Sequence, residues 1–294
     1  MTQRWVEERR VDVDGRPVAV RQGGDPEGRA LVYFHGTPSS RLETTYADQL
    51  CAELGIRMIS FDRPGYGDSP PAPFSLSSIA RDTGVLADAL GVARFATVGQ
   101  SGGGPFSLAA AAVLGDRVTR VGVASGAGPF AQVPELSAVL DETDRAALGL
   151  LPDRAAAAAQ FAAGFEPLRG LFTGSLSQIT GGFRQMLNAH DGTLLDRPEF
   201  ATCLAGAMQE SLKNGTTGAG WDNVSWVGPW DVDLAAIRQP VHLWYGEGDT
   251  LCPPVAGTWL DEHLPTATLV VRPGEGHMGV MEHAREIFTT LVSD

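Results

Sequence analysis

One stretch constrains the fold of this chain more than any other. An apolar run at 96–98 leads into Gly99-Gln100-Ser101-Gly102-Gly103, and a helix-forming segment follows at 106–114. A strand, the pattern Gly-x-Ser-x-Gly and a helix in direct succession predict a nucleophile elbow, a tight turn that projects the serine from strained backbone. Side chains at Gly99 and Gly103 would collide with the neighbouring strand and helix. Taken alone, the pattern also fits an ordinary glycine-rich turn, so the rest of the chain must decide.

Short β-type runs alternate with helical runs, which predicts an α/β fold with a mostly parallel sheet flanked by helices. Besides the elbow strand, strands are expected at 6–13, 17–22, 30–34, 57–61, 118–124, 241–245 and 268–271, and helices at 42–54 and 79–90. The first two strands are expected to form a hairpin through Asp14-Gly15. Alanine-rich helical pieces replace the strand signals in the middle of the chain. We therefore expect a core formed by 1–128 and 231–294, with 129–230 as a helical insertion.

Composition excludes several classes of partner. The net charge of −13 over 294 residues argues against nucleic acid and against an anionic membrane surface. No apolar run reaches membrane-spanning length, and the N-terminus lacks the apolar core of a signal peptide, so a cytoplasmic protein is expected. Three scattered cysteines, Cys51, Cys203 and Cys252, form neither a disulfide framework nor a zinc pattern. The sequence leaves open whether the chain forms a homodimer.

A serine nucleophile needs a base within hydrogen-bonding reach, and His277 is the best candidate among six histidines. It lies in a glycine-flanked loop after the last expected strand, where open α/β sheets place their ligands. An acid that orients the base is expected between the serine and the histidine, again after a strand. Asp249 occupies such a place, and Glu247 is its rival. The order Ser101, Asp249, His277 differs from the orders that other serine-hydrolase folds use.

With these residues in place, the chain resembles the α/β-hydrolase-fold family over nearly its whole length. His35-Gly36-Thr37-Pro38 resembles the family's oxyanion loop, and the segment 61–69 resembles the supporting turn after its fourth strand. The insertion at 129–230 corresponds to the family's helical cap. The resemblance implies an oxyanion hole formed by the backbone N–H groups of Thr37 and Gly102. It also implies supporting roles for His35, Gly36, Gly99 and Gly103.

The resemblance further implies the reaction. Ser101 attacks a carbonyl carbon, His277 takes its proton, Asp249 holds the imidazole, and water then releases the acyl group. No metal and no organic cofactor is needed. The glycines at 102–104 are expected to leave the elbow unusually open, because many relatives carry bulkier residues there. A serine in place of a carboxylate also argues against the haloalkane dehalogenase and epoxide hydrolase branches.

The expected substrate is a small molecule, a small or medium apolar ester. Aromatic residues of the insertion that could wall its pocket are Phe161, Phe165, Phe172, Phe183, Trp221, Trp226 and Trp230, although for any single one simple packing is the better interpretation. Three alternatives stay open. A proline-iminopeptidase-like amidase would need carboxylates of the insertion to bind a free amino terminus, from among Glu166, Asp191, Glu199, Glu210 and Asp222. A cofactor-free haloperoxidase or acyltransferase would use the same triad, and a catalytically silent binding protein would keep only the fold.

Overall fold

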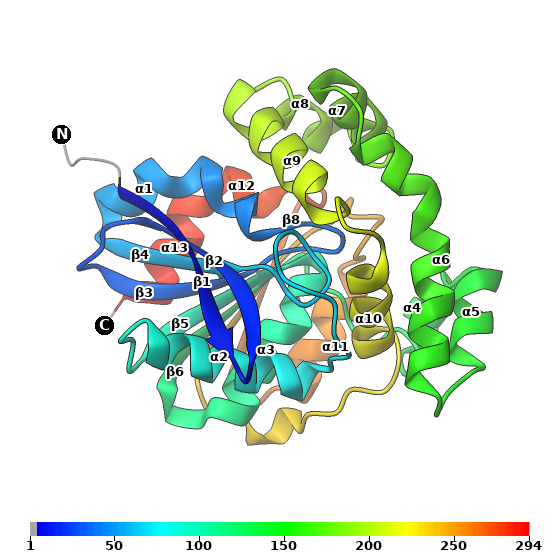
Figure 1. Cartoon of the computed structure of the whole chain (residues 1–294), viewed down its shortest axis with the longest axis horizontal. Coiled ribbons are helices and arrows are strands. Elements are labelled where there is room, and N and C mark those ends of the chain that lie inside the picture. The colour runs from blue at the N-terminus through cyan, green and yellow to red at the C-terminus, as the bar shows by residue number, and fades with distance from the viewer. Residues whose placement is uncertain (1–4, 294) are drawn as a thin grey trace.

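The computed structural model describes residues 5–293, and its centre is an eight-stranded sheet in the order β1-β2-β4-β3-β5-β6-β7-β8 (Figure 1). The strands are β1 (Trp5–Val13), β2 (Arg16–Gly24), β3 (Arg29–Phe34), β4 (Ile56–Phe61), β5 (Phe95–Gln100), β6 (Val118–Ala124), β7 (Val241–Gly246) and β8 (Ala267–Arg272). β2 pairs antiparallel with β1 and β4, and the other neighbours pair in parallel. The predicted mostly parallel α/β sheet is therefore confirmed.

The hairpin at the start of the chain forms where the sequence predicts it. Asp14 and Gly15 between β1 and β2 both have positive φ, +50° and +80°. Two central residues of that kind define the type I′ turn, whose twist matches that of the flanking strands. The ladder runs in register from Trp5 opposite Gly24 to Val13 opposite Arg16.

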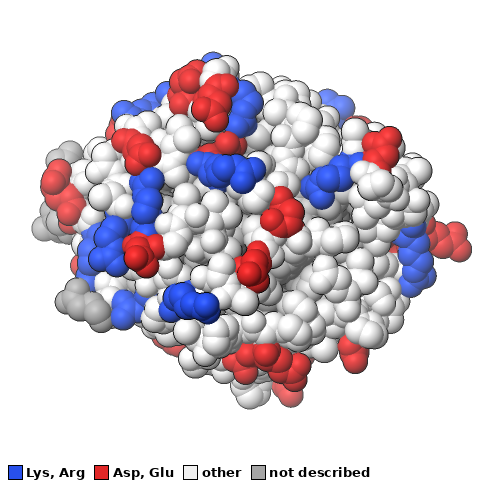
Figure 2. Space-filling model, turned by 90° about the horizontal axis from the view of Figure 1, so that it is seen from below, with Lys and Arg blue, Asp and Glu red and all other residues white. Residues whose placement is uncertain are grey.

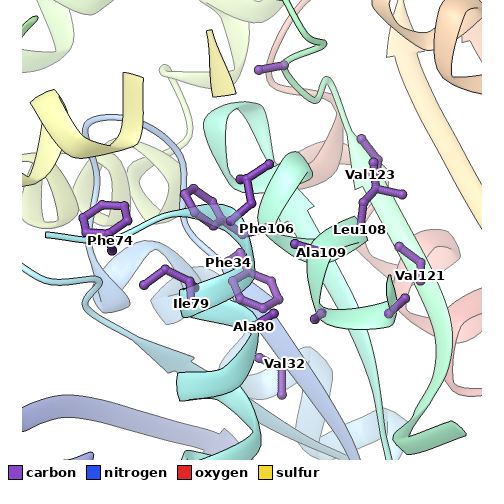
Figure 3. Close-up of a cluster of buried hydrophobic side chains, with 14 of the residues drawn as sticks. Val32, Phe34, Phe74, Ile79, Ala80, Phe106, Leu108, Ala109, Val121 and Val123 are labelled. Carbon is purple, nitrogen blue, oxygen red and sulfur yellow. The ribbon is translucent and has the colours of Figure 1, made fainter. Parts of the chain in front are cut away.

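Helices cover both faces of the sheet. The core helices are α1 (Asp48–Leu54), α2 (Leu76–Ala89), α3 (Gly104–Leu114), α11 (Val255–His263), α12 (Gly279–Glu282) and α13 (Ala284–Val292), with short 3-10 turns η1 (Arg41–Ala47), η2 (Ser101–Gly103), η3 (Gly115–Arg117) and η4 (Leu234–Ala236). Successive side chains of β3 alternate between the hydrophobic clusters on the two faces of the sheet. Val32 and Phe34 join the cluster beneath α2 and α3 (Figure 3). Leu31 and Tyr33 join the cluster on the opposite face. Every residue of β5 is buried, as a central strand requires.

The segment expected to form one helix at 42–54 is instead a 3-10 turn, η1, followed by α1. Tertiary contacts account for the tighter turn, because its polar side chains are buried against other parts of the chain. The Glu43 carboxylate accepts a hydrogen bond from Tyr33, and the Arg41 guanidinium binds Asp62. α2 also begins three residues earlier than expected, at Leu76, because Ser75 and Ser78 form a reciprocal capping box.

Seven helices lie between β6 and β7, and we call them the inserted helices: α4 (Pro134–Ser137), α5 (Glu142–Leu148), α6 (Arg154–Phe172), α7 (Leu176–Arg184), α8 (Ala189–Leu194), α9 (Pro198–Ser211) and α10 (Thr217–Trp226). Figure 1 shows α6 to α10 along one side of the sheet, in green and yellow. The elements of residues 5–293 include no helix with both the length and the apolar character needed to cross a membrane.

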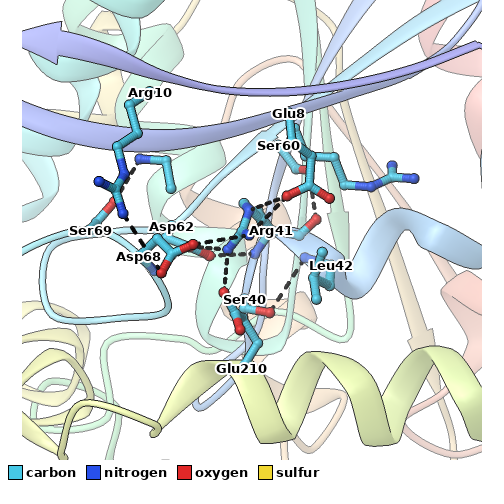
Figure 4. A network of polar contacts seen from close by, with 12 residues as sticks. Glu8, Arg10, Ser40, Arg41, Leu42, Ser60, Asp62, Asp68, Ser69 and Glu210 are labelled. Carbon is cyan, nitrogen blue, oxygen red and sulfur yellow. Dashed lines mark hydrogen bonds and ion pairs between the residues drawn. The ribbon is translucent and has the colours of Figure 1, made fainter.

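Arg41 joins three parts of the molecule (Figure 4). Its guanidinium donates hydrogen bonds to Glu8 of β1 at 2.9 Å, to Asp62 after β4 at 2.6 Å and to Glu210 of α9 at 2.6 Å. The arginine is largely buried and Asp62 is fully buried. The network therefore ties an inserted helix to the edge of the sheet. At the surface, acidic and basic side chains are interspersed over the face seen in Figure 2.

Candidate active site

Ser101 lies at the sharp turn between β5 and α3, with a φ of +54°. Positive φ is uncommon for a residue with a side chain, and such backbone strain costs about 1–3 kcal/mol. The flanking glycines are required by close backbone approach. A Cβ at Gly99 would lie 2.1 Å from the Gly103 carbonyl oxygen, and one at Gly103 would lie 2.1 Å from the Phe34 carbonyl oxygen. The predicted elbow geometry is thus present.

The expectation of an unusually open elbow is wrong. A Cβ at Gly102 would lie 2.2 Å from Thr37 Oγ1 and 3.2 Å from Trp226 Nε1, and one at Gly104 would lie 2.9 Å from the Gly126 α-carbon. The space that side chains at 102 and 104 would need is therefore filled by neighbouring segments. A sequence pattern cannot show this, because the absence of a side chain says nothing about what packs in its place.

His277 and Asp249 are brought together by the loops after β8 and β7. His277 Nδ1 lies 2.8 Å from Asp249 Oδ2, while Asp249 Oδ1 accepts hydrogen bonds from the Leu251 and Cys252 N–H groups, both at 2.9 Å. A carboxylate can only accept, so Nδ1 carries the proton and Nε2 is the ring's free acceptor. The rival Glu247 lies elsewhere: it is exposed and accepts the Gly274 N–H at 3.2 Å.

Electrostatics around His277 favour its charged form. Burial alone would lower the pKa of this imidazole, but the charge and hydrogen bond of Asp249, together with the charges of Asp191 and Glu43, outweigh burial and raise the pKa above its ordinary value. Burial would raise the pKa of Asp249, yet His277 and two backbone N–H groups lower it. The pair therefore exists as a carboxylate beside an imidazole that readily accepts a proton.

The oxyanion loop is held from two sides. Gly36 N–H donates to Glu43 Oε2 at 3.0 Å, and Arg63 Nη1 donates to the His35 carbonyl oxygen at 2.8 Å. Thr37 Oγ1 donates to Asp222 Oδ2 of α10 at 2.7 Å. His35 is itself buried, with Nδ1 2.8 Å from the Gly36 carbonyl oxygen. The loop that would supply the Thr37 donor is therefore fixed before any substrate binds.

Arg63 and Asp222 form a buried ion pair beneath this loop. Arg63 Nη2 lies 2.5 Å and Nε 2.7 Å from the two Asp222 oxygens, and the Tyr66 hydroxyl donates to the same carboxylate at 2.6 Å. Both charged side chains are almost completely buried. Neither was predicted to have this role; the segment 61–69 marked Arg63 only as part of a supporting turn.

Ser101, His277, Thr37 and Gly102 line one cavity of about 230 Å³. Its walls are mainly apolar. Leu168, Phe172, Phe183, Leu204, Met208 and Trp226 come from the inserted helices, whereas Phe130, Met186, Leu251, Met278 and Met281 come from other segments. Of the aromatic residues named from the sequence, only Phe172, Phe183 and Trp226 line the cavity. The Trp226 indole N–H is buried and has no partner among the described residues.

The polar residues at the cavity that were not foreseen include Glu43 and Cys252. Glu43 lines it from η1, and burial raises the pKa of this carboxyl, although hydrogen bonds from Ser39, Tyr33 and Gly36 oppose the rise. Cys252 lies beside Ser101, and burial raises the pKa of its thiol well above the ordinary value. A thiol in this state is a poor nucleophile.

None of the five carboxylates that an amidase would need lines the cavity. Asp191 and Asp222 are fully buried among hydrogen-bond donors, and Glu210 binds Arg41. Within residues 5–293, the one group of potential metal ligands comprises Glu275, Glu282 and His283. It does not include Ser101, Asp249 or His277, and His283 is paired with Glu275 at 3.0 Å.

Comparison with known proteins gives consistent results. The family model for the alpha/beta hydrolase fold matches residues 29–284. The chain is 37% identical over 65 residues to a pimeloyl-[acyl-carrier protein] methyl ester esterase of Aromatoleum aromaticum, which is 22% of this chain and 26% of that protein. It is 30% identical over 136 residues to epoxide hydrolase A of Mycobacterium tuberculosis, or 45% of this chain and 42% of that protein. The matched segments thus span less than half of each relative.

Among solved structures, a bromoperoxidase from Bacillus anthracis superposes with a TM-score of 0.70 at 19% identity, covering 97% of this chain and 99% of that one. At that identity the likeness shows the fold. The family match covers most of the chain and agrees with the observed sheet. The chain therefore belongs to the α/β-hydrolase-fold family.

Proposed function

We propose that this protein hydrolyses carboxylic esters with small or medium apolar acyl groups through an acyl-enzyme on Ser101. The observation that carries the proposal is that Ser101 and His277 line one largely apolar cavity of about 230 Å³, while Asp249 contacts His277 Nδ1 at 2.8 Å. A cavity of this kind binds an apolar acyl chain by burying it, with a few polar groups to fix its orientation.

The proposed reaction starts with proton transfer. His277 Nε2 takes the proton of the Ser101 hydroxyl while the oxygen attacks the ester carbonyl carbon. Asp249 stabilises the imidazolium that forms, because its carboxylate already accepts the Nδ1 proton at 2.8 Å. His277 then donates the proton to the departing alcohol, which leaves the acyl group on Ser101. Water deprotonated by the same imidazole releases the acid.

The negative charge of the tetrahedral intermediate would be met by the backbone N–H groups of Thr37 and Gly102. Donors that are already oriented lower such barriers by about 3–4 kcal/mol each. Here the orientation comes from Asp222 and Arg63, which hold the loop at Thr37. The inserted helices act as the cap of the site, since α6, α7, α9 and α10 all contribute apolar residues to its wall.

The test is a substrate panel with the full-length protein. p-Nitrophenyl acetate, butyrate, octanoate and palmitate are compared with aminoacyl p-nitroanilides. We expect kcat/KM to be highest for butyrate or octanoate, because a palmitoyl chain exceeds the cavity, and anilides to be hydrolysed far more slowly. Ser101→Ala should abolish turnover, whereas Ser177→Ala, at an exposed serine of α7, should not.

The amidase and the binding protein each have their own outcome in this panel. Anilide turnover above ester turnover would favour the amidase, although no carboxylate of the inserted helices lines the cavity. Ester turnover that survives Ser101→Ala would reject the nucleophile. Ligand binding without any turnover by the wild type would favour a catalytically silent binding protein.

A further inference from the structure

The loop that carries His277 is held by a carboxylate of the inserted helices. Asp191 of α8 accepts a hydrogen bond from the Gly276 N–H at 3.2 Å and another from the Met278 N–H at 3.0 Å. These two residues stand on either side of His277 in the chain. The Asp191 side chain therefore holds the backbone on both sides of the proposed base, and it does not line the cavity.

Asn188, which caps the N-terminus of α8, and His190 within the helix extend this contact. The Asn188 side chain accepts the Asp191 N–H at 2.9 Å and donates to the Gly274 carbonyl oxygen at 3.4 Å. His190 Nε2 lies 2.8 Å from Glu282 Oε2 in α12. The helix α8 and its cap residue thus contact the chain at Gly274, on both sides of His277, and at Glu282.

Gly276 permits this contact because it has no side chain. A Cβ at Gly276 would lie 2.4 Å from Asp191 Oδ2 and 2.9 Å from the Asn188 side-chain carbon, so α8 fills the space that a side chain would need. The absence of a side chain at Gly276 is what lets the Asp191 carboxylate reach the two N–H groups.

The burial of Asp191 is too costly to be explained by packing alone. Its side chain is fully buried, and the donors that bind it are the backbone N–H groups of Gly276 and Met278, not a lysine or an arginine. Burial raises the pKa of this carboxyl, while backbone N–H groups and the charge of His277 lower it. Apolar residues usually fill such a position at lower free energy than a buried charge. What the carboxylate adds is fixed loop geometry and negative charge beside the imidazole.

We propose that Asp191 is a positioning residue that holds the His277 loop, so that the base is in place only when the inserted helices are seated on the core. The proposal rests on the proposed function, in which His277 acts as the base. It assigns the inserted helices a part in assembling the catalytic machinery, in addition to lining the acyl cavity.

The first experiment compares Asp191→Asn with Asp196→Asn in the full-length protein. Asp196 is a matched control, an exposed aspartate of the same segment whose side chain pairs with Arg184 at the surface. An amide keeps the size of Asp191 but offers one acceptor for two N–H groups. We expect kcat for p-nitrophenyl butyrate to fall about 10- to 100-fold with KM little changed, since a small misplacement of a catalytic group has effects of this size. Asp196→Asn should leave kcat unchanged.

The second experiment measures the His277 pKa directly by NMR, with its imidazole signal assigned by its loss in His277→Gln. The ionisable groups that face the ring are Asp249, Asp191, Glu43 and Cys252. Removal of the Asp191 charge should lower the pKa of His277, whereas a merely structural role would reduce thermal stability and leave the pKa unchanged. An unchanged pKa together with an unchanged kcat would overturn the proposal.

A third variant tests the proposal if Asp191→Asn folds poorly. Gly276→Ala leaves Asp191 intact but displaces it from the loop, and it should reproduce the loss of kcat; full activity would contradict the proposal. The titration also separates this proposal from the proposed function. A wild type that hydrolyses no ester but shows the pKa shift on Asp191→Asn would reject the ester hydrolase and retain the contact of Asp191 with His277.

Discussion

At the scale of single residues, the His277 imidazole lies between two carboxylates of different origin. Asp249 comes from the loop after β7 and binds Nδ1 directly, whereas Asp191 comes from α8 and binds the backbone on either side of the ring. Both add negative charge near the imidazole, and both are buried. Their effects differ because only Asp249 can fix the tautomer.

The first prediction distinguishes the two acids that the sequence offered. Asp249→Asn should reduce kcat by about 10⁴-fold, because an amide in place of the carboxylate favours the wrong tautomer and cannot stabilise the imidazolium. Glu247→Gln should leave kcat within about twofold, because its carboxylate accepts the Gly274 N–H and lies at the surface. Steady-state kinetics on p-nitrophenyl butyrate provide the measurement. The reverse ranking would reassign the acid.

The second prediction concerns pH. His277 must be neutral to act as a base, and its pKa is raised in the fold by Asp249, Asp191 and Glu43 against the effect of burial. A raised pKa means that the neutral form appears only as the pH rises through that value. We therefore expect kcat/KM to increase with pH along a limb centred above the ordinary histidine value of about 6.5. A limb centred below that value would contradict the electrostatic account.

At the scale of elements, helix α10 packs against the turn η2 at Gly102. Asp222 and Trp226 are four residues apart on α10, so they share one face of the helix. Asp222 holds the Thr37 hydroxyl, and Trp226 packs where a Gly102 side chain would stand. The glycine next to the nucleophile thus makes room for an inserted helix and for the oxyanion loop.

The third prediction tests this packing. Gly102→Ala would place a methyl group 2.2 Å from Thr37 Oγ1 and 2.8 Å from Thr37 Cβ, so the oxyanion loop must move. We expect kcat to fall by about 10²-fold, comparable to the loss of one oxyanion donor. Gly181→Ala is the control, because a Cβ there meets nothing within 4 Å. In a helix this control should be neutral or slightly stabilising. Equal activity of both variants would show that the elbow has room after all.

The sequence predicted those parts of the site that depend on local pattern. The strand–turn–helix spacing identified Ser101 as the candidate nucleophile. The positions of His277 and Asp249 in loops after strands identified them as the candidate base and acid. Asp222 and Arg63 could not be paired in this way, because 159 residues separate them and only the packing of α10 brings them together. The same holds for Asp191, whose partners are backbone N–H groups that any sequence would supply. The expectation that Gly102 leaves open space was wrong because the residues that pack there, Thr37 and Trp226, are distant from it in the chain.

At the scale of the whole molecule, buried charges connect the inserted helices to the core at three places. Arg41 reaches Glu210 of α9, Arg63 reaches Asp222 of α10, and Asp191 of α8 reaches the His277 loop. All three contacts lie close to the site or to the loops that form it. Displacement of the inserted helices would therefore disturb the oxyanion loop and the base together, in addition to opening the cavity.

The fourth prediction concerns stability. Arg41→Gln would leave the fully buried Asp62 carboxylate without its cation, and breaking a buried pair in this way costs about 3–5 kcal/mol. Arg184→Gln, which removes an exposed pair with Asp196, should cost less than about 1 kcal/mol. Urea unfolding followed by circular dichroism measures both. Similar midpoints for the two variants would show that the Arg41 network contributes little to the fold.

The most direct test of the account is covalent labelling of the nucleophile. The full-length wild type is treated with a fluorophosphonate, and the modified residue is located by mass spectrometry of its peptides. The account predicts rapid, stoichiometric labelling at Ser101, slowed by orders of magnitude in His277→Ala because the hydroxyl then has no base. Labelling at another residue, or ester hydrolysis that continues after Ser101 is fully modified, would contradict it.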